Sequence, residues 1–419
     1  MHLPKIALAA LLLPLPAAAQ DDLLAELVKT SPALAVAEEE AKAARADLWA
    51  ARGSRLPQLR VEAQAGTLEE TFRINGVPGE LSATRDPAGA TATLEQTVFA
   101  SGRIGGAIGA AKAQASGAEL QYNAARQDLI LAGVTAIADV VLARAVLSER
   151  RDNEAVIRSR LDESTARRTA GLATRTDVRQ SEARVALASA ERIAAEGQLA
   201  QAEARFERVF GKAAPSTLAI PKASAPLPSD LQSAVDRALT SNPDLAASVA
   251  GRKAAEQAVR SERGALLPQV SVRGTASYAE NERFGIELGE AEQFAVTLNG
   301  RWDIFRGGSG YASTRAAKRR ARGADERVRD TRRIVREQTV AAWTGLITAR
   351  AAAQAREAQV LAARLSAEGV AAEFSSGRRT RLDVLDADRE ETLAEVGLLT
   401  TRRDLAIAEF ALLRAVGGL

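Results

Sequence analysis

Apolar residues recur at two different periods along the first half of the chain, and each change of period marks an element. Residues 21–52 carry leucine and alanine every three or four positions among charged residues, which is typical of an amphipathic helix. From Leu59 the period falls to two, so that apolar and polar residues alternate as in a strand with two unlike faces. A stretch with Gly and Pro at 75–89 separates two such strands. The predicted elements are helix 21–52, strand 59–65, strand 90–98, helix 103–169 and helix 177–210.

The second half repeats this order of elements. Between the halves, residues 211–228 contain four prolines, Pro215, Pro221, Pro226 and Pro228, and we interpret this segment as a linker. The predicted elements of the second half are helix 229–265, strand 270–278, strand 294–304, helix 309–373 and helix 380–416.

Short motifs confirm that the chain is an internal duplication. Ser-Pro-Ala-Leu at 31–34 returns as Asn-Pro-Asp-Leu at 242–245, an offset of 211 residues. Gly171, Thr174 and Asp177 return as Gly377, Thr380 and Asp383, an offset of 206 residues. A repeat this long defines a protomer with two similar halves rather than a solenoid. The predicted domains are a signal peptide at 1–19, a first repeat at 20–210, the linker at 211–228 and a second repeat at 229–419.

The helix lengths predict an elongated assembly. At about 1.5 Å per residue, helices 103–169 and 309–373 are each roughly 100 Å long, and two of the shorter helices placed end to end would match one of them. Alanine dominates their contact positions, and small residues permit close helix packing in supercoiled bundles. Such helices cannot bury their apolar stripes within one thin protomer, so the pattern favours several copies of the chain.

The strands also favour several copies. Each is about ten residues long, which suits a tilted crossing of a bilayer. One face is apolar, and the other carries Glu62, Glu95, Arg273, Arg301 and Asp303. An open sheet edge is not tolerated in hydrocarbon, and membrane barrels begin at eight strands. Four strands per chain therefore predict an oligomeric barrel, whereas two soluble hairpins packed on helices remain the alternative.

The beginning of the chain predicts export from the cytoplasm. His2 and Lys5 precede an apolar run from Ile6 to Leu13, and Ala17-Ala18-Ala19 is a small-residue cleavage site. This is the pattern of a secretory signal peptide. No later stretch approaches twenty uninterrupted apolar residues, so we expect no transmembrane helix.

The composition argues against catalysis. The chain has no Cys, and its one His lies within the predicted signal peptide. An imidazole base, a thiol nucleophile and a soft metal site are therefore missing from the mature protein, and neither a P-loop nor a dinucleotide fingerprint is present. We predict that the protein is not an enzyme and needs no cofactor or metal.

Arginine and lysine crowd one helical segment, 315–336. In a cytosolic protein such a segment would suggest nucleic acid, but the signal peptide argues against that partner, and no aromatic residues are interleaved. We interpret it as a solvated helix face with partial ion pairing, and contact with anionic lipid headgroups is a second hypothesis.

Several motifs together resemble one family. The segment from Phe374 to Ala387, Phe-Ser-Ser-Gly-Arg-Arg-Thr-Arg-Leu-Asp-Val-Leu-Asp-Ala, resembles the helix–turn–helix tip of TolC-type outer-membrane efflux proteins. Its counterpart in the first repeat is 171–178, Gly-Leu-Ala-Thr-Arg-Thr-Asp-Val. The Leu-Pro-Gln before each first strand and the Phe-to-Gly exits at 99–102 and 305–308 fit the same family. The similarity runs from about residue 21 to 419, in order and twice.

The resemblance implies a mainly helical fold with a small β part. Three copies would form one barrel of 12 strands in the outer membrane, and their helical hairpins would form a tunnel through the periplasm. The segment 211–228 and the C-terminus would surround the middle of that tunnel. The implied partners are a periplasmic adaptor (membrane fusion protein), an inner-membrane transporter of the RND or ABC type, and outer-membrane lipid, with no nucleic acid. The exported substrate is not specified by the sequence.

The resemblance also implies which residues gate the channel. Asp383 and Asp386 are three residues apart and share one helix face, so that threefold symmetry would make rings of carboxylates that attract cations. Asp177, Arg379 and Phe374 occupy the positions of an acid–arginine–tyrosine network that holds the closed state. Phe374 lacks the tyrosine hydroxyl, so we expect a weaker closed state, or one held by Arg175 or Arg381. The turns at the tips, with Gly171, Thr174, Gly377 and Thr380, are the implied docking points for the adaptor.

Two functions are consistent with the sequence. The first is a passive outer-membrane duct of a tripartite efflux or type I secretion system, gated at its periplasmic tips. The second is a periplasmic coiled-coil scaffold that never inserts into a membrane and uses its hairpins for docking.

Overall fold

The computed structural model describes residues 17–73, 75, 78–280 and 290–419. The predicted signal peptide, 1–19, lies almost wholly outside these residues. The helices are α1 (Ala17–Thr30), α2 (Pro32–Gly53), α3 (Arg103–Thr169), α4 (Arg175–Phe210), α5 (Leu231–Ser241), α6 (Pro243–Gly264), α7 (Ser309–Ser375) and α8 (Arg381–Ala415). The strands are β1 (Gln58–Ala65), β2 (Leu68–Phe72), β3 (Leu81–Arg85), β4 (Ala88–Phe99), β5 (Gln269–Glu280) and β6 (Glu290–Arg301).

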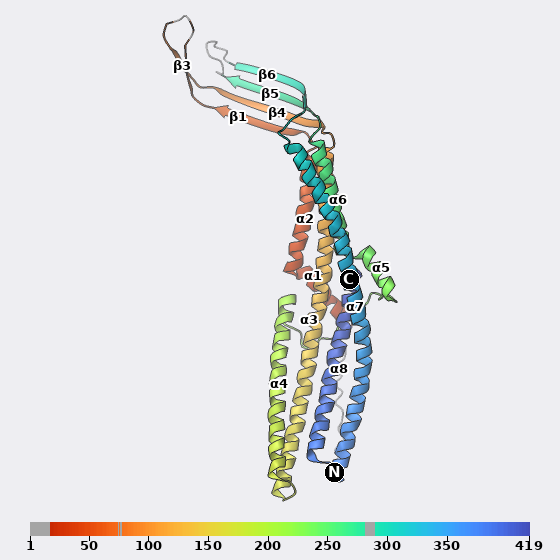
Figure 1. Ribbon diagram of the computed structural model, residues 1–419. Helices are drawn as coiled ribbons and strands as arrows, with labels where there is room; N and C mark the ends of the chain where they lie inside the picture. The colour runs from red at the N-terminus through yellow and green to blue at the C-terminus, as the bar shows by residue number, and fades with distance from the viewer. Residues whose placement is uncertain (1–16, 74, 76–77, 281–289) are drawn as a thin grey trace. The chain divides into compact units, whose positions relative to one another are not determined.

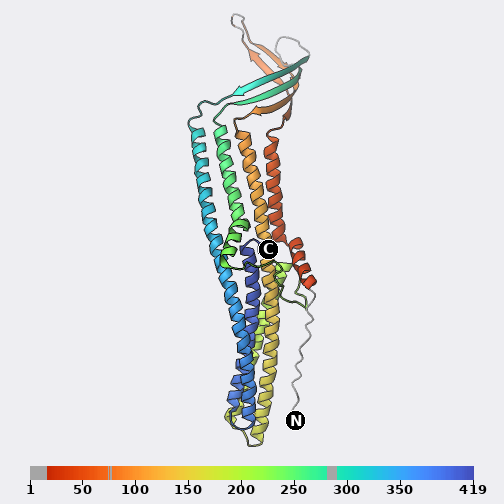
Figure 2. The ribbon, with the colours of Figure 1, turned by 90° about the vertical axis from the view of Figure 1, so that its right-hand side faces the viewer.

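The chain divides into two compact units that do not coincide with the two repeats. Unit 1 comprises Met1–Glu38, Leu120–Ala246 and Asp330–Leu419, and unit 2 comprises Glu39–Glu119 and Ala247–Arg329. Each unit takes segments from both repeats, because helices of the first repeat pack beside those of the second (Figures 1 and 2). The division into repeats therefore describes the sequence, whereas packing joins corresponding parts of the two repeats.

Two predicted helices are each divided in the structure. Helix 21–52 becomes α1 and α2, with the break at Ser31, and helix 229–265 becomes α5 and α6, with the break at Asn242. A proline follows each break. Proline is tolerated at the first position of a helix, because the N–H group that it lacks would have no acceptor within the helix. The Oδ1 atom of Asn242 accepts hydrogen bonds from the backbone N–H of Asp244 at 2.9 Å and of Leu245 at 3.2 Å. The prediction of single helices was wrong because these capping groups restart the helix.

The main sheet lies in unit 2 and has the strand order β1-β4-β5-β6, with every pair antiparallel (Figure 1). Strands 59–65, 90–98 and 270–278 match the prediction closely, but β6 ends at Arg301, so that Trp302 and Ile304 lie beyond it. A separate hairpin of β2 and β3 was not predicted, because five alternating residues per strand are too few to identify from periodicity. Within the described residues, β1 and β6 are the edges of the four-stranded sheet.

The register confirms that the sheet has one polar and one apolar face. Glu95 pairs with Arg273, which pairs with Thr297, and paired residues share a face. The side chains of Glu95 and Arg273 form an ion pair at 2.9 Å. The opposite face is apolar and open in the single chain: Leu59 is 69% exposed, Leu298 72% and Phe294 78%. An apolar surface of this extent indicates an apolar environment or a partner.

The core of unit 1 lies between α1, α3 and α4. It contains Leu27, Ile137 and Phe206, which are almost fully buried, and the Phe206 and Phe210 rings stack with centroids 4.3 Å apart. By length and composition, one described helix, α3, also contains an 18-residue window with a mean hydropathy of 2.1, enough to cross a membrane. One third of that window is buried in the single chain, and α3 residues such as Ile137 and Val140 belong to the core.

The basic segment of α7 shows partial ion pairing. Arg329 pairs with Asp325 and Glu326, each at 3.0 Å, and Asp325 also lies 3.6 Å from Arg252 on α6. Arg319, Arg320 and Arg322 are exposed. This agrees with a solvated helix face, while contact with lipid headgroups stays a prediction.

Gly106 permits the close approach of α3 and α6 in unit 2. A Cβ atom at this position would lie 2.4 Å from the backbone nitrogen of Ser261 and 2.8 Å from the carbonyl oxygen of Gln257, so a helix would have to move. We expect Gly106→Ala to destabilise the protein by about 1–3 kcal/mol, the usual effect of overpacking. The measurement is thermal unfolding followed by far-UV circular dichroism.

Gly251→Ala is the matched control for this change. Gly251 lies on α6 and has no atom within 4 Å of its added Cβ. Alanine there should stabilise the helix by up to about 1 kcal/mol through propensity alone. Equal effects of the two changes would show that the close approach at Gly106 does not limit stability.

Candidate gate at the helix tips

The far ends of unit 1 are two similar helix–turn–helix tips. One joins α3 to α4 and the other joins α7 to α8 (Figure 1). Gly171 and Gly377 adopt the left-handed conformation, with φ of 76° and 79°, which favours glycine. The backbone N–H of Leu172 donates to the carbonyl of Arg167 at 2.8 Å, and that of Arg378 donates to Glu373 at 2.9 Å. These bonds close both turns in the same way.

A capping box starts the helix after each turn. The side chain of Thr174 accepts from the backbone of Asp177, and Asp177 Oδ2 accepts from the Thr174 N–H at 2.7 Å. Thr380 and Asp383 repeat this arrangement, with the return bond at 2.8 Å. The backbone hydrogen bond from the threonine holds the pKa of each aspartate below its usual value. Both carboxylates are therefore bound locally as anions, and the exposed Gly171, Thr174, Gly377 and Thr380 form rigid turns.

The structure does not bring the predicted acid–arginine–aromatic network together. Asp177 bonds to its own turn, and Arg379 Nε donates to Glu373 Oε2 at 2.8 Å within its own hairpin. The helices α3 and α4 form one hairpin, and α7 and α8 form a second. Of the three predicted residues, only Phe374, on α7, contacts the hairpin to which it does not belong. Its ring lies 5.4 Å from the guanidinium carbon of Arg167 on α3 and 5.2 Å from that of Arg381 on α8.

Arg381 makes the main polar contact between the two hairpins at this level. Its Nη2 atom donates to Glu163 Oε2 at 2.6 Å and to the backbone carbonyl of Arg160 at 3.0 Å, both on α3. The Arg381 side chain is only 11% exposed, and its Nη1 atom is buried without a hydrogen-bond partner. We call Arg167, Phe374, Arg381 and Glu163 the tip clasp.

Further ion pairs join the hairpins just behind the clasp. Arg184 on α4 donates to Asp386 on α8 at 2.6 Å, and Arg160 on α3 lies 3.4 Å from Asp388 on α8. The two predicted gate acids thus differ in role within one chain. Asp383 caps its helix, whereas Asp386 holds two hairpins together.

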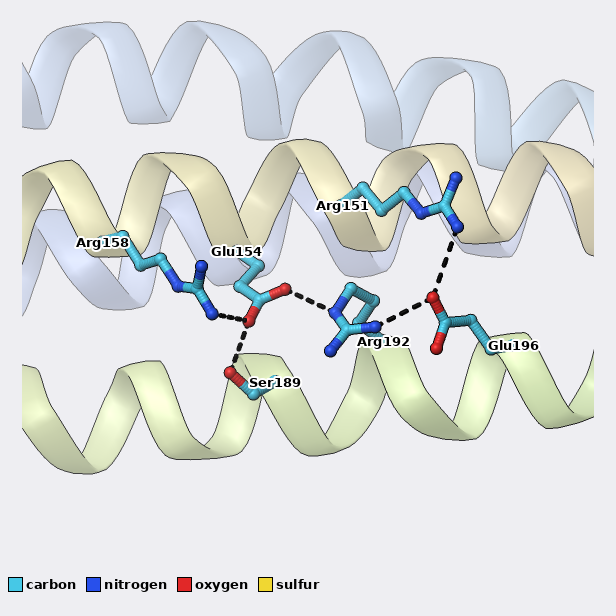
Figure 3. Close-up of polar contacts among 6 residues, drawn as sticks. All are labelled: Arg151, Glu154, Arg158, Ser189, Arg192 and Glu196. Atoms are coloured by element: carbon cyan, nitrogen blue, oxygen red, sulfur yellow. Dashed lines mark hydrogen bonds and ion pairs between the residues drawn. The ribbon is translucent and has the colours of Figure 1, made fainter.

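Ion pairs and hydrogen bonds also join the two helices within each hairpin. In the first hairpin, Glu154 on α3 is nearly buried and accepts hydrogen bonds from Ser189, Arg158 and Arg192, the last at 2.6 Å (Figure 3). These bonds, that from Ser189 foremost, hold the pKa of Glu154 below its usual value. Arg192 and Arg151 continue the network to Glu196 (Figure 3). In the second hairpin, Arg364 on α7 binds Glu391 and Glu395 on α8. These contacts between its two helices make each hairpin a semi-rigid body.

Sequence reasoning missed Glu163, Arg167, Arg184 and Arg160. One signal could have pointed to this region, namely the positions at which the two repeats differ. Phe374 corresponds to Arg168 in the first repeat, Asp386 to Gln180, and Glu163 to Gly369. Arg381 itself is matched by Arg175, so these differences point to the partners of Arg381 and not to Arg381; the capping boxes, which serve each turn alone, are the same in both repeats.

Within the described residues, no group of three or more His, Cys, Asp or Glu side chains could hold a metal ion.

The chain belongs to the outer membrane efflux protein family, whose family model matches residues 23–212 and 234–418. Outer-membrane localisation follows from this membership, and a scaffold that never inserts does not fit it. The family consists of transport channels, not of known enzymes.

Named relatives and solved structures agree with this assignment. The chain is 30% identical to the outer membrane efflux protein BepC of Brucella suis over 77% of this chain and 71% of that protein. It is 25% identical to the outer membrane protein TolC of Vibrio cholerae, over 74% and 72%. The fold is similar to the Campylobacter jejuni CmeC outer membrane channel, with a TM-score of 0.85, 16% identity, and coverage of 95% of this chain and 85% of that one. For the Vibrio cholerae outer membrane protein VceC the TM-score is 0.82 with 20% identity and 96% coverage of both chains.

Proposed function

We propose that three copies of this chain form a gated duct that passively conducts substrates across the outer membrane. The observation that carries this proposal is the open sheet, whose edges β1 and β6 and apolar face have no partner within the described residues of one chain. An open edge in a bilayer costs several kcal/mol for each unsatisfied backbone group. Three copies pair β6 of one with β1 of the next and give twelve strands, within the range of membrane barrels.

The faces of the sheet then divide between lipid and lumen. Leu59, Phe294 and Leu298 would contact lipid, and the face with Glu95 and Arg273 would line the lumen. Charges of both signs on the lumen face give no strong selectivity. The substrate, drug or protein, would be selected by the inner-membrane transporter, which also supplies the energy. In this arrangement the mature protein follows a signal peptide at 1–19, and 211–228 surrounds the middle of the tunnel between the repeats at 20–210 and 229–419.

The tips would form the periplasmic gate. In a trimer, Asp383 and Asp386 form rings of carboxylates around the axis, and the tip clasp holds α7 and α8 against α3 in the closed state. Opening would break the contacts of the tip clasp, while each hairpin, held together by its own ion pairs, would move as a unit. A periplasmic adaptor, carrying substrate from an RND or ABC transporter, would dock on the exposed turns at Gly171, Thr174, Gly377 and Thr380.

The test of this function is single-channel conductance of the purified protein in planar bilayers. We expect discrete openings of small conductance that a trivalent cation blocks from the side bearing the tips only. Asp383→Asn with Asp386→Asn should abolish the block, and Asp177→Asn, which keeps a capping side chain in the other tip, should preserve it. Absence of conductance from a protein that stays soluble without detergent would contradict the duct.

Phe374→Tyr should stabilise the closed state. The ring keeps its contact with Arg167 and Arg381 and gains a hydroxyl that can bind a neighbouring polar group. A hydrogen bond contributes about 0.5–1.5 kcal/mol, so open probability should fall roughly two- to tenfold. Phe374→Leu, which removes the aromatic face, should raise it. Open probability is measured in the same bilayers, and an unchanged value for both variants would show that Phe374 does not contribute to gating.

A further inference from the structure

A cavity of about 440 Å³ lies within unit 1, away from the tips. Its walls come from α1, from α3, from the end of α8 and from the linker segment 221–225. The apolar side chains that line it include Leu24, Val28, Ile130, Phe410 and Leu413. The volume is in the range of small-molecule sites, which are about 300–1,000 Å³.

The charged side chains that line this cavity are all basic. They are Lys29 on α1, Arg126 on α3 and Lys222 on the linker, and the lining contains no Asp or Glu. Arg126 Nη1 donates at 3.4 Å to the main-chain oxygen of Leu419, the last residue of the sequence, which also lines the cavity. Neither Lys29 nor Lys222 forms an ion pair with any residue that the structure describes. An apolar cavity with unpaired ammonium groups is complementary to a molecule with an apolar body and an anionic end.

The linker wall lies between the two stretches that match the family model. The family match stops at residue 212 and resumes at 234, so 221–225 lies outside it. Pro221 is buried, and Lys222, Ser224 and Ala225 follow it along the cavity. The linker thus supplies one of the two unpaired lysines and closes the apolar surface formed by α1 and α8.

We propose that this cavity binds a long-chain carboxylate, such as a free fatty acid. The acyl chain packs on Val28, Phe410 and Leu413, and the carboxylate binds Lys29 and Lys222. A buried methylene group contributes about 0.8 kcal/mol to transfer from water, which makes the chain the main source of affinity and the lysines the source of selectivity for an anion. The bound molecule joins α1, α8 and the linker, so it stabilises unit 1. The site does not depend on the gate.

The test uses the full-length mature protein in lipid nanodiscs, because detergent would compete for the cavity. Laurate and dodecanol are titrated by isothermal calorimetry against loaded and empty nanodiscs. We expect saturable binding of one laurate per chain, with dodecanol binding at least about fivefold more weakly. Lys29→Gln with Lys222→Gln should weaken laurate binding about tenfold and leave dodecanol unchanged, since two exposed charges are lost.

A filling variant and a matched lysine variant complete the design. Ala225→Trp should abolish binding of both ligands, and its fold is checked by circular dichroism; Val28→Trp serves as a second filling variant from a different wall. Lys253→Gln, which does not line the cavity, should bind laurate as the unchanged protein does. Laurate binding that survives both filling variants would mean partition into lipid and overturn the proposal. Laurate binding that is insensitive to the two lysine changes would overturn the assignment of an anionic ligand. The absence of laurate binding to the loaded nanodiscs would overturn the proposal as a whole.

Discussion

Arg381→Met should shift the channel toward its open state by about five- to thirtyfold. Arg381 is nearly buried and joins α8 to α3 through Glu163, whereas Glu163 is 42% exposed. Removing one partner of a fully buried pair costs about 3–5 kcal/mol, and the exposure of Glu163 lowers this to roughly 1–2 kcal/mol. Methionine keeps the length of the side chain and loses the charge. The measurement is open probability in planar bilayers at moderate salt.

Arg379→Met is the matched control, and it separates two accounts of the gate. Arg379 pairs with Glu373 in its own hairpin, so its loss should change open probability less than twofold. The family resemblance, in contrast, makes Arg379 the arginine of the closed-state network. If Arg379→Met opened the channel and Arg381→Met did not, the tip clasp would be wrong. Glu163→Gln combined with Arg381→Met should add little to the single changes, because both remove the same contact.

Glu149→Gln should make the helical bundle of unit 1 more stable at alkaline pH. Glu149 on α3 is half-buried, and burial together with Glu395 on α8 raises its pKa to about 7. Asp152 raises the pKa further, while Arg364 on α7 opposes the shift. A carboxyl group with a raised pKa stabilises the fold while protonated, and that stability is lost as pH rises from 4.5 to about 7. The loss is about 1–2 kcal/mol after allowance for solvent exposure.

The measurement is the melting temperature by circular dichroism at pH 5 and pH 8.5. The unchanged protein should lose stability between these values through Glu149, and Glu149→Gln should lose less, because the amide does not ionise. Glu182→Gln on α4 is the control, since Glu182 pairs with Arg179 on its own helix at 2.6 Å. Parallel pH profiles for Glu149→Gln and the unchanged protein would contradict a proton shared between α3 and α8.

Most of the architecture could be predicted from periodicity. The bounds of α3 match the prediction at both ends, and those of α7 and α8 differ by two residues or fewer. Long helices with repeated apolar positions carry a strong signal, and Gly171 and Gly377 mark their turns. The breaks at Ser31 and Asn242 were missed because each depends on a local cap before proline. The β2–β3 hairpin was missed because it is short.

One part of the candidate gate could be predicted from the sequence, and another part could not. Asp177 and Asp383 bind within their own turns, and local bonds of this kind follow from residues three apart. The clasp partners Glu163 and Arg167 lie more than two hundred residues from Arg381, and no local pattern links them. Their contact depends on how α3 packs against α7 and α8, and on which side chains point into the space between the hairpins.

The sequence by itself determined the duplication, the order of helices and strands and the two faces of the sheet. These follow from periods of 3.6 and 2 and from turn residues, which act over a few positions. Only the tertiary structure decided that Arg381 joins the hairpins while Arg379 remains within one, and that three basic residues from α1, α3 and the linker share one cavity. Such groups interact through space, because packing places side chains from distant parts of the chain within hydrogen-bonding distance.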